Sequence, residues 1–151
     1  MGEKHSEKID EKKRNLDLHP DVRPRQWVDL ACVFVLGDSL RIHQVIANLL
    51  ANARVHTPAG TKISVSVKQD DLGTSISVSD NGPGLSEESQ KKIFERFYRA
   101  DPSRVRNGVE GTGLGLSIVD AVMTAHGGSV KVESELGKGA TFTLFFPIQE
   151  L

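Results

Sequence analysis

Residues 61–85 read TKISVSVKQDDLGTSISVSDNGPGL, and this stretch decides the fold. Apolar and polar residues alternate through 61–69 and again through 74–80, which is the period of a β-strand with one buried face. The residues DDLG between the two runs supply a turn, so the stretch predicts an antiparallel hairpin. One face of that hairpin carries the apolar side chains Ile63, Val65, Val67, Ile76 and Val78.

Asp80 ends the second strand and, by the same alternation, lies on the face that carries Ile76 and Val78. A carboxylate on a buried face needs a hydrogen-bond donor, because burying it unpaired is costly. Gly82 and Gly84 have no Cβ and leave room for a flat ligand beside the carboxylate. An ordinary Asp-Asn-Gly turn explains the same residues equally well.

Upstream of the hairpin, a strand and a helix are expected. The apolar run VDLACVFVL, residues 28–36, predicts a short strand that ends at Gly37. Asp38 can cap a helix over 39–55, which ends at the turn TPAG. The three- and four-residue spacing predicts one buried face for this helix, formed by Ile42, Val45, Ile46, Leu49, Leu50 and Ala53.

Downstream, Ser86 can cap a short helix over 86–97, and the polar residues 99–110 are typical of a mobile loop that serves as a lid. The glycine-rich residues 111–115 lead into a helix that ends at Gly127. Residues 128–135 and 140–147 form a last hairpin around the turn LGKG. This order predicts a two-layer α/β sandwich, with a mostly antiparallel sheet and helices on one face.

Length and composition favour one intracellular domain. The chain has 151 residues and a formal net charge of -1, from 19 basic and 20 acidic residues, so no overall charge indicates nucleic acid or a membrane surface. The single cysteine, Cys32, excludes an internal disulfide and suits a reducing compartment, and no apolar run is long enough to span a bilayer. We expect a cytoplasmic domain over 27–151, preceded by a polar tail or linker remnant over 1–26 that can be disordered.

Asn48 and Asn52 lie four residues apart, which stacks them on one edge of the predicted helix over 39–55. Asparagine is a poor helix former, so two on one edge indicate a function. An amide oxygen is a suitable ligand for Mg²⁺, which keeps waters and phosphates in the rest of its shell. The other interpretation is that both side chains face solvent.

Gly111, Gly113 and Gly115 stand immediately before a predicted helix. Backbone amides at such a helix start can hold a phosphate. No strand precedes these glycines, as a dinucleotide-binding fingerprint requires, and no Gly-Lys-Ser/Thr follows, as a Walker loop requires. A glycine hinge without a ligand remains the other interpretation.

Arginines flank the predicted lid. Arg96 and Arg99 lie at its base, and either can reach a terminal phosphate when a lid closes. For Arg104 and Arg106, a solvated surface is the better interpretation. A carboxylate beside glycines, an asparagine pair and a glycine-rich helix start together predict a site for a Mg-nucleotide.

Four sequence segments resemble the N, G1, F and G2 boxes of the catalytic ATP-binding domain of bacterial sensor histidine kinases. They are NLLANARVHTP, DNGPGL, IFERFYR and GTGLGLSIV, and the similarity runs from about residue 37 to residue 147. The resemblance implies the Bergerat fold of the GHKL superfamily, a mixed sheet under three helices with a mobile ATP lid. It also implies ATP and Mg²⁺ as cofactors.

The resemblance assigns a role to individual residues. Asp80 would accept a hydrogen bond from the adenine amino group, with Gly82 and Gly84 against the base and Thr141 supporting Asp80 through water. Asn52 would bind the metal, and Arg99 would contact the γ-phosphate. The stretch Gly111, Thr112, Gly113, Leu114, Gly115 and Leu116 would line the phosphates. His56 falls where the family often has an aromatic residue near the nucleotide, although a histidine that only ends the helix fits as well.

Two positions set this chain apart within the resemblance. Members that hydrolyse ATP have a glutamate one turn before the metal-binding asparagine, whereas this chain has Asn48, an amide that cannot act as a general base. We therefore expect phosphoryl transfer rather than hydrolysis, with Asn48 and Arg99 as the catalytic-site residues. Many members have a cation at the position of Val55, and the neighbouring Arg54 points about 100° away on a helix.

The resemblance also implies partners. The phosphate-accepting histidine of such kinases lies on a separate dimerisation domain, which His5 matches only weakly. We expect this piece to be a monomer that belongs to a homodimeric, membrane-anchored sensor kinase and serves a response regulator. Two alternatives stay open: a serine/threonine kinase of the anti-sigma type, and a nucleotide-sensing module without chemistry.

Overall fold

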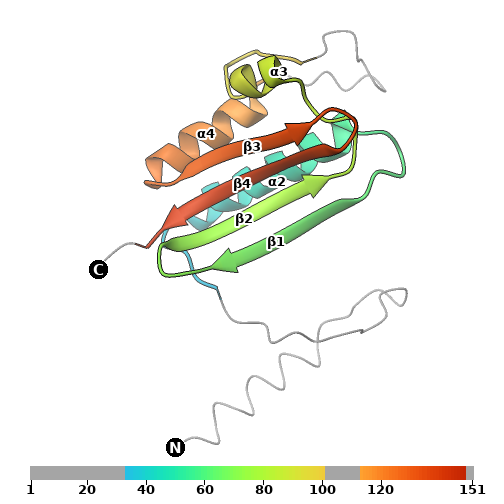
Figure 1. Cartoon of the computed structure of the whole chain (residues 1–151). Helices are drawn as coiled ribbons and strands as arrows, with labels where there is room; N and C mark the ends of the chain where they lie inside the picture. Colours follow the sequence, from blue (N-terminus) through green and yellow to red (C-terminus); the bar gives the residue numbers. More distant parts are fainter. Residues whose placement is uncertain (1–32, 101–112, 149–151) are drawn as a thin grey trace, which may run out of the picture. The chain divides into compact units, whose positions relative to one another are not determined.

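Four strands form one antiparallel sheet in the order β1–β2–β4–β3 (Figure 1). Their bounds are β1 Ile63–Gln69, β2 Gly73–Asp80, β3 Ser129–Glu135 and β4 Gly139–Pro147. The computed structural model describes residues 33–100 and 113–148, which belong to one unit beginning at Val33. Both predicted hairpins are confirmed, since β1 pairs with β2 and β3 pairs with β4.

Three helices complete the described part: α2 (Ser39–His56), α3 (Glu87–Lys92) and α4 (Gly115–Ala125). Figure 1 shows α2 and α4 on the same face of the sheet, where they pack against each other. The predicted two-layer α/β sandwich is therefore confirmed. Every strand pair in the described ranges is antiparallel, so the parallel pairing expected of a mixed sheet does not occur there.

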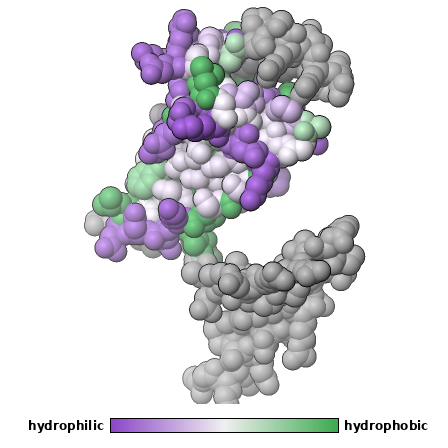
Figure 2. Space-filling model, turned by 45° about the vertical axis from the view of Figure 1, so that its right-hand side comes forward, coloured by the Kyte–Doolittle hydropathy of each residue, from purple (hydrophilic) through white to green (hydrophobic). Residues whose placement is uncertain are grey.

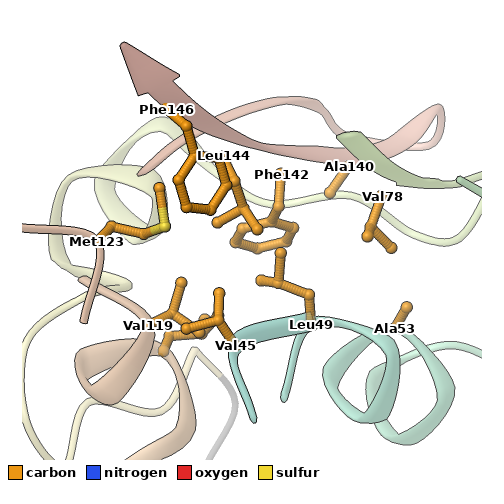
Figure 3. Close-up of a cluster of buried hydrophobic side chains, with 11 residues drawn as sticks. Val45, Leu49, Ala53, Val78, Val119, Met123, Ala140, Phe142, Leu144 and Phe146 are labelled. Atoms are coloured by element: carbon orange, nitrogen blue, oxygen red, sulfur yellow. The ribbon is translucent and has the colours of Figure 1, made fainter. Parts of the chain in front are cut away.

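The core fills the space between the sheet and the pair α2 and α4. In Figure 3, Val45 and Leu49 of α2 and Val119 of α4 point toward Phe142 and Leu144 of β4. The other members of this cluster are Ala53, Val78, Leu116, Met123, Ala140 and Phe146. Large apolar side chains are fully buried on both layers, which fixes the helices against β2 and β4.

α2 begins as predicted, because the Asp38 side chain accepts a hydrogen bond from the backbone N–H of Arg41 at 3.1 Å. The Asp38 N–H also donates to Nε2 of His126 at 3.1 Å, so the start of α2 is joined to the end of α4. The predicted buried face is correct for its central stripe but wrong for Leu50, which is 37% exposed. Leu50 lies about 100° around the helix from Leu49, on the side away from the core.

The apolar side chains of β1 share one face, as predicted, but they are not buried. Val65 stands opposite Val78 in the sheet, yet Val65 is 51% exposed while Val78 is 2% exposed. Ile63 and Val67 are exposed as well. The physical reason is that β1 is an edge strand and α2 packs over β2 instead.

The strand predicted over 28–36 is wrong for residues 33–36, which have no regular structure, and residues 28–32 lie outside the described ranges. Phe34, Val35 and Leu36 line a small cavity of about 300 Å³ together with Gly73 and Thr74 of β2 and the end of β4. The segment therefore meets the ends of the strands instead of extending an edge.

The helix predicted over 86–97 is shorter than expected. Ser86 caps it as predicted, by accepting from the Ser89 N–H at 3.1 Å, but α3 ends at Lys92 and turns follow. Lys92 donates to Glu88 at 2.9 Å, and this hydrogen bond, reinforced by the opposite charge, lowers the pKa of Glu88 and raises that of Lys92. Most of the expected lid, residues 101–110, lies outside the described ranges.

The face of the sheet without helices is rich in hydroxyl groups. Ser77 pairs with Thr143 at 3.0 Å, and Ser79 pairs with Thr141 at 2.8 Å, both between side-chain oxygens of β2 and β4. Figure 2 shows pale and hydrophilic side chains with several smaller hydrophobic patches among them. Hydroxyl pairs therefore lie on this open face, whereas the apolar core lies on the helix side.

Candidate functional site

A cavity of about 530 Å³ lies on the helix side of the sheet. Its wall is built by α2, the loop after β2, α3 with the residues that follow it, the start of α4, and β4. Most of the predicted site residues that the structure describes lie in this wall: Asn48, Asn52, His56, Asp80, Gly84, Arg99, Gly113, Gly115 and Leu116. Segments as far apart in the chain as Asn48 and Phe142 therefore meet around one cavity, as the sequence motifs predicted.

Asp80 is half-buried at the end of β2 and faces the cavity. Its Oδ1 atom accepts a hydrogen bond from the backbone N–H of Gly82 at 2.9 Å. The donor that a buried carboxylate needs is thus supplied in part by the turn itself, and Oδ2 has no partner in residues 33–100 and 113–148. The turn interpretation and the ligand interpretation therefore hold together, because one oxygen closes the turn while the other stays available to a ligand.

The two glycines of the loop that follows Asp80, residues 81–85, which we call the Asp80 loop, let neighbouring parts of the chain pack closely. Gly84 has φ +72°, and a Cβ there would overlap the carbonyl oxygen of Glu135. A Cβ on Gly82 would lie 2.7 Å from Cγ2 of Thr57, which is buried at the end of α2. Gly84 lines the cavity, whereas Gly82 packs against Thr57, and the contact of Gly82 with the base stays a prediction.

Asn48, Asn52 and His56 follow one edge of α2 and line the cavity, and both asparagines are half-buried there. The Asn48 Nδ2 group donates to the carbonyl oxygen of Gly115 at 3.3 Å. Asn52 is half-buried and makes no hydrogen bond to the described parts of the chain. Val55 also lies in the wall.

Gly113 and Gly115 form the part of the wall at the start of α4. A Cβ on Gly115 would meet no atom of residues 33–100 and 113–148 within 4 Å, so these residues leave the backbone there open to a ligand. Gly113, with φ +67°, accepts a hydrogen bond from the Phe97 N–H at 3.0 Å, which joins the two ends of the segment 98–112. Leu114 caps α4 but does not line the cavity, and Gly111 and Thr112 lie outside the described ranges.

Of the predicted arginines, Arg99 is half-buried and lines the cavity. Arg96 and Arg54 are exposed and are absent from its wall. Arg104 and Arg106 fall outside the described ranges. Among the arginines in residues 33–100 and 113–148, Arg99 is therefore the one that lines the cavity.

The predicted role of Thr141 is corrected. Thr141 stands opposite Ser79 in the sheet and bonds to its hydroxyl, so its side chain lies on the open face, away from Asp80. The neighbouring Ala140 is buried and lines the cavity instead. The alternation along β4 predicts that Ala140 and not Thr141 lies on the buried face, because Ala140 shares that face with Phe142, Leu144 and Phe146.

Several wall residues were missed by sequence reasoning. Ser86, Ser89 and Tyr98 bring three hydroxyl groups to the cavity, and Leu136 brings an apolar side chain from the turn between β3 and β4. Gly139, with φ +96°, packs against the backbone of Asp80, where a Cβ would overlap the carbonyl oxygen. A leucine inside the otherwise polar turn LGKG was the one available signal for Leu136.

The described parts of the chain contain neither a metal-binding group of three or more His, Cys, Asp or Glu side chains nor a helix that could span a membrane. Residues 33–100 and 113–148 contain no group of three or more His, Cys, Asp or Glu side chains placed to hold a metal ion. A metal in the cavity would therefore depend on amide oxygens and on the ligand's own oxygens. None of the helices described is long and apolar enough to cross a bilayer.

Comparisons with known proteins agree with this geometry. A family profile described as "Histidine kinase-, DNA gyrase B-, and HSP90-like ATPase" matches residues 37–150. The sensor protein IrlS of Burkholderia pseudomallei is 45% identical over 113 residues, 75% of this chain and 24% of IrlS. The sensor-like histidine kinase SenX3 of Mycolicibacterium smegmatis is 43% identical over 113 residues, 75% of this chain and 29% of SenX3. The chain thus spans only 24–29% of the length of these relatives.

Solved structures give the same result. The mycobacterial sensor histidine kinase MprB superposes with a TM-score of 0.68 at 30% identity, covering 78% of each chain. Full-length ShkA in complex with AMPPNP superposes with a TM-score of 0.64 at 32% identity, covering 79% of this chain and 24% of ShkA. Sequence and structure comparisons therefore point to one kind of domain.

Proposed function

The chain belongs to the family of histidine kinase-, DNA gyrase B- and HSP90-like ATPases, as a catalytic domain of the sensor histidine kinase type, and we propose how it acts. It binds Mg-ATP in the cavity and donates the γ-phosphoryl group to a histidine on a separate dimerisation domain. The observation that carries this proposal is that Asp80, Asn52, Gly115 and Arg99 line one cavity. In this proposal, Asp80 matches the base, Asn52 matches the metal, and Gly115 and Arg99 match the phosphates.

Four wall residues have a chemical task in this proposal. Asp80, with Oδ1 fixed by Gly82, offers Oδ2 to the exocyclic amino group of adenine. Asn52 offers an amide oxygen that suits Mg²⁺, and the open backbone at Gly115 suits phosphate oxygens. Arg99 supplies a positive charge toward the terminal phosphate. ATP supplies the reactive γ-phosphoryl group when it is bound.

Transfer is favoured over hydrolysis because the residue one turn before Asn52 on α2, where hydrolysing members have a glutamate, is not a general base. Asn48 is an amide, and it donates its N–H to Gly115 instead of accepting a proton from water. The protein's contribution is then orientation and charge stabilisation. The γ-phosphorus leaves the β-phosphate oxygen and bonds to an imidazole nitrogen of the acceptor, and ADP remains.

The acceptor and the wider assembly are part of the proposal. We place residues 27–151 as the catalytic domain and 1–26 as the linker that leads into it. The complete protein would be a homodimeric, membrane-anchored sensor kinase with this domain in the cytoplasm. Its phosphohistidine would then pass the phosphoryl group to a response regulator.

The test mixes the chain with a histidine-containing dimerisation domain and radiolabelled ATP. An acid-labile, base-stable phosphoprotein that forms only with Mg²⁺ is the expected result. The Asp80→Asn variant serves as the matched control, because it should bind ATP weakly and label the acceptor slowly. Confirmed ATP binding without any phosphohistidine on several acceptor domains would count heavily against the transfer function.

A second candidate, a nucleotide-sensing module without chemistry, is favoured by one observation. Val55 lies in the cavity wall at the position where the resemblance leads us to expect a cation for the phosphates. ATP binding that changes partner binding but labels no protein would support this candidate. Acid-stable label on a serine or threonine would instead indicate the anti-sigma type of kinase.

A further inference from the structure

Three hydroxyl groups meet on one side of the cavity and form what we call the hydroxyl triad, Ser86, Ser89 and Tyr98. The Ser86 hydroxyl donates to Oγ of Ser89 at 3.0 Å, and the Tyr98 hydroxyl donates to the same atom at 3.2 Å. Ser89 is only 8% exposed. The triad joins α3 to the residue directly before Arg99.

Counting protons shows that the triad has one donor to spare. Each hydroxyl carries one proton and two acceptor lone pairs. The two bonds within the triad use two of the three protons and both lone pairs of Ser89. Within residues 33–100 and 113–148, no atom accepts the third proton, which belongs to Ser89. A buried donor that lines a cavity and lacks a protein acceptor points to a ligand atom or to water that a ligand displaces.

The position of the triad selects the part of the ligand that it meets. Ser86 follows directly on the Asp80 loop, whose residues Gly84 and Leu85 also line the cavity. The phosphate side, at Gly113 and Gly115, comes from the start of α4. We infer that Ser89 donates a hydrogen bond to an acceptor atom of the nucleoside, a ring nitrogen or a ribose oxygen. This inference rests on the proposed function, because it takes the ligand to be an adenine nucleotide.

The experiment measures binding of ATP and of adenosine to the Ser89→Ala variant by calorimetry. Removal of the donor is expected to weaken both ligands by the same factor, about 3- to 10-fold, because the acceptor atom is then desolvated without a partner. Ser77→Ala is the matched control, since Ser77 is a half-buried serine that also loses a hydroxyl contact, but on the open face of the sheet. It should bind both ligands as the unmodified chain does.

Three outcomes would overturn the inference. They are an affinity of Ser89→Ala within twofold of the unmodified chain, a loss confined to ATP with adenosine unaffected, and an equal loss in Ser77→Ala. If thermal unfolding shows that Ser89→Ala is not folded, Ser89→Cys decides. Its weaker S–H donor should bind adenosine less tightly than serine does, and unchanged binding would refute the contact.

Two further measurements separate related possibilities. A Ser89→Ala effect that disappears with 2′-deoxyadenosine identifies a ribose oxygen as the acceptor, and one that persists with the free base adenine identifies a ring nitrogen. Failure of the unmodified chain to bind ATP or adenosine would remove the proposed function and this inference together. Normal binding by the unmodified chain with no effect of Ser89→Ala would remove this inference alone.

Discussion

The side chain of Asn48 on α2 donates a hydrogen bond to the backbone carbonyl of Gly115, the first residue of α4, across 3.3 Å. This bond joins the two helices where both border the cavity. It also gives Asn48 a positioning role at the predicted phosphate site that a carboxylate could not fill, because a carboxylate has no proton to donate.

Asn48→Ala should therefore destabilise the chain relative to Asn52→Ala. The two residues lie one turn apart on the same edge of α2, so the change from asparagine to alanine raises the helix propensity equally in both variants. Only the Asn48 variant loses a hydrogen bond. We expect a difference in the free energy of unfolding of about 0.5–1.5 kcal/mol, measured by urea denaturation without nucleotide. Equal stabilities would mean that the Asn48 contact contributes nothing in solution.

Asn52→Ala should remove the dependence of ATP binding on Mg²⁺ while leaving adenosine binding nearly intact, because the amide oxygen is the proposed metal ligand. Calorimetry of ATP with Mg²⁺ and with EDTA, and of adenosine, gives the three affinities needed. A parallel loss for ATP and adenosine would point to a damaged fold and would contradict a metal-specific role.

Asp80→Asn should weaken adenine recognition by about 1–3 kcal/mol without unfolding the loop. The amide oxygen can still accept from the Gly82 N–H, so the turn is kept, but the amide nitrogen replaces the acceptor Oδ2. Matched titrations with ATP and with adenosine measure the effect, and thermal unfolding checks the fold. Unchanged affinity would show that Asp80 only closes the turn.

Gly139→Ala should be much more damaging than Gly137→Ala, although both glycines have positive φ in the same turn. A Cβ on Gly139 would overlap the carbonyl of Asp80, whereas a Cβ on Gly137 would meet nothing within 4 Å. We expect losses in unfolding free energy of about 2–5 and about 1–2 kcal/mol, respectively. Similar losses would show that the turn does not press on the Asp80 backbone.

Leu136→Ala should weaken nucleotide binding by about 1 kcal/mol, since Leu136 is 66% exposed at the cavity wall and a bound base would cover part of it. The turn is held in place by the Gly137 N–H, which donates to the Pro83 carbonyl at 2.8 Å. Leu72→Ala is the control, because Leu72 is 73% exposed but does not line this cavity. Equal affinities of the two variants would exclude a contact between Leu136 and the base.

Local patterns predicted the elements well wherever a single segment carries the information. The alternation in 61–80, the caps Asp38 and Ser86, and the glycine-rich start of α4 each depend on neighbours in the chain, and all of them hold. The helix predicted over 86–97 is longer than the observed α3. Ser86 marks where α3 starts, but the chain turns after Lys92 and reaches a positive φ of 64° at Phe97.

Burial was predicted less well than periodicity. The alternation of β1 is as regular as that of β2, yet Val65 is exposed and Val78 is buried, because one lies on an edge strand and the other under α2. Leu50 fails for the same reason, since an apolar residue on a helix is buried only if another element covers it. A pattern defines a face, but it does not say how wide the covering layer is.

The sequence by itself determined which residue types are brought to the cavity proposed for the nucleotide, because the motifs Asn48–Asn52, Asp80–Gly84 and Gly113–Gly115 each lie within one turn or loop. Only the tertiary structure decided that Asn48 meets Gly115, that Gly139 presses on Asp80, and that Tyr98 reaches Ser89. Hydrophobic burial drives the layers together but is not directional, so it leaves such pairings open. They are fixed by close packing and by hydrogen-bond geometry between segments far apart in the chain.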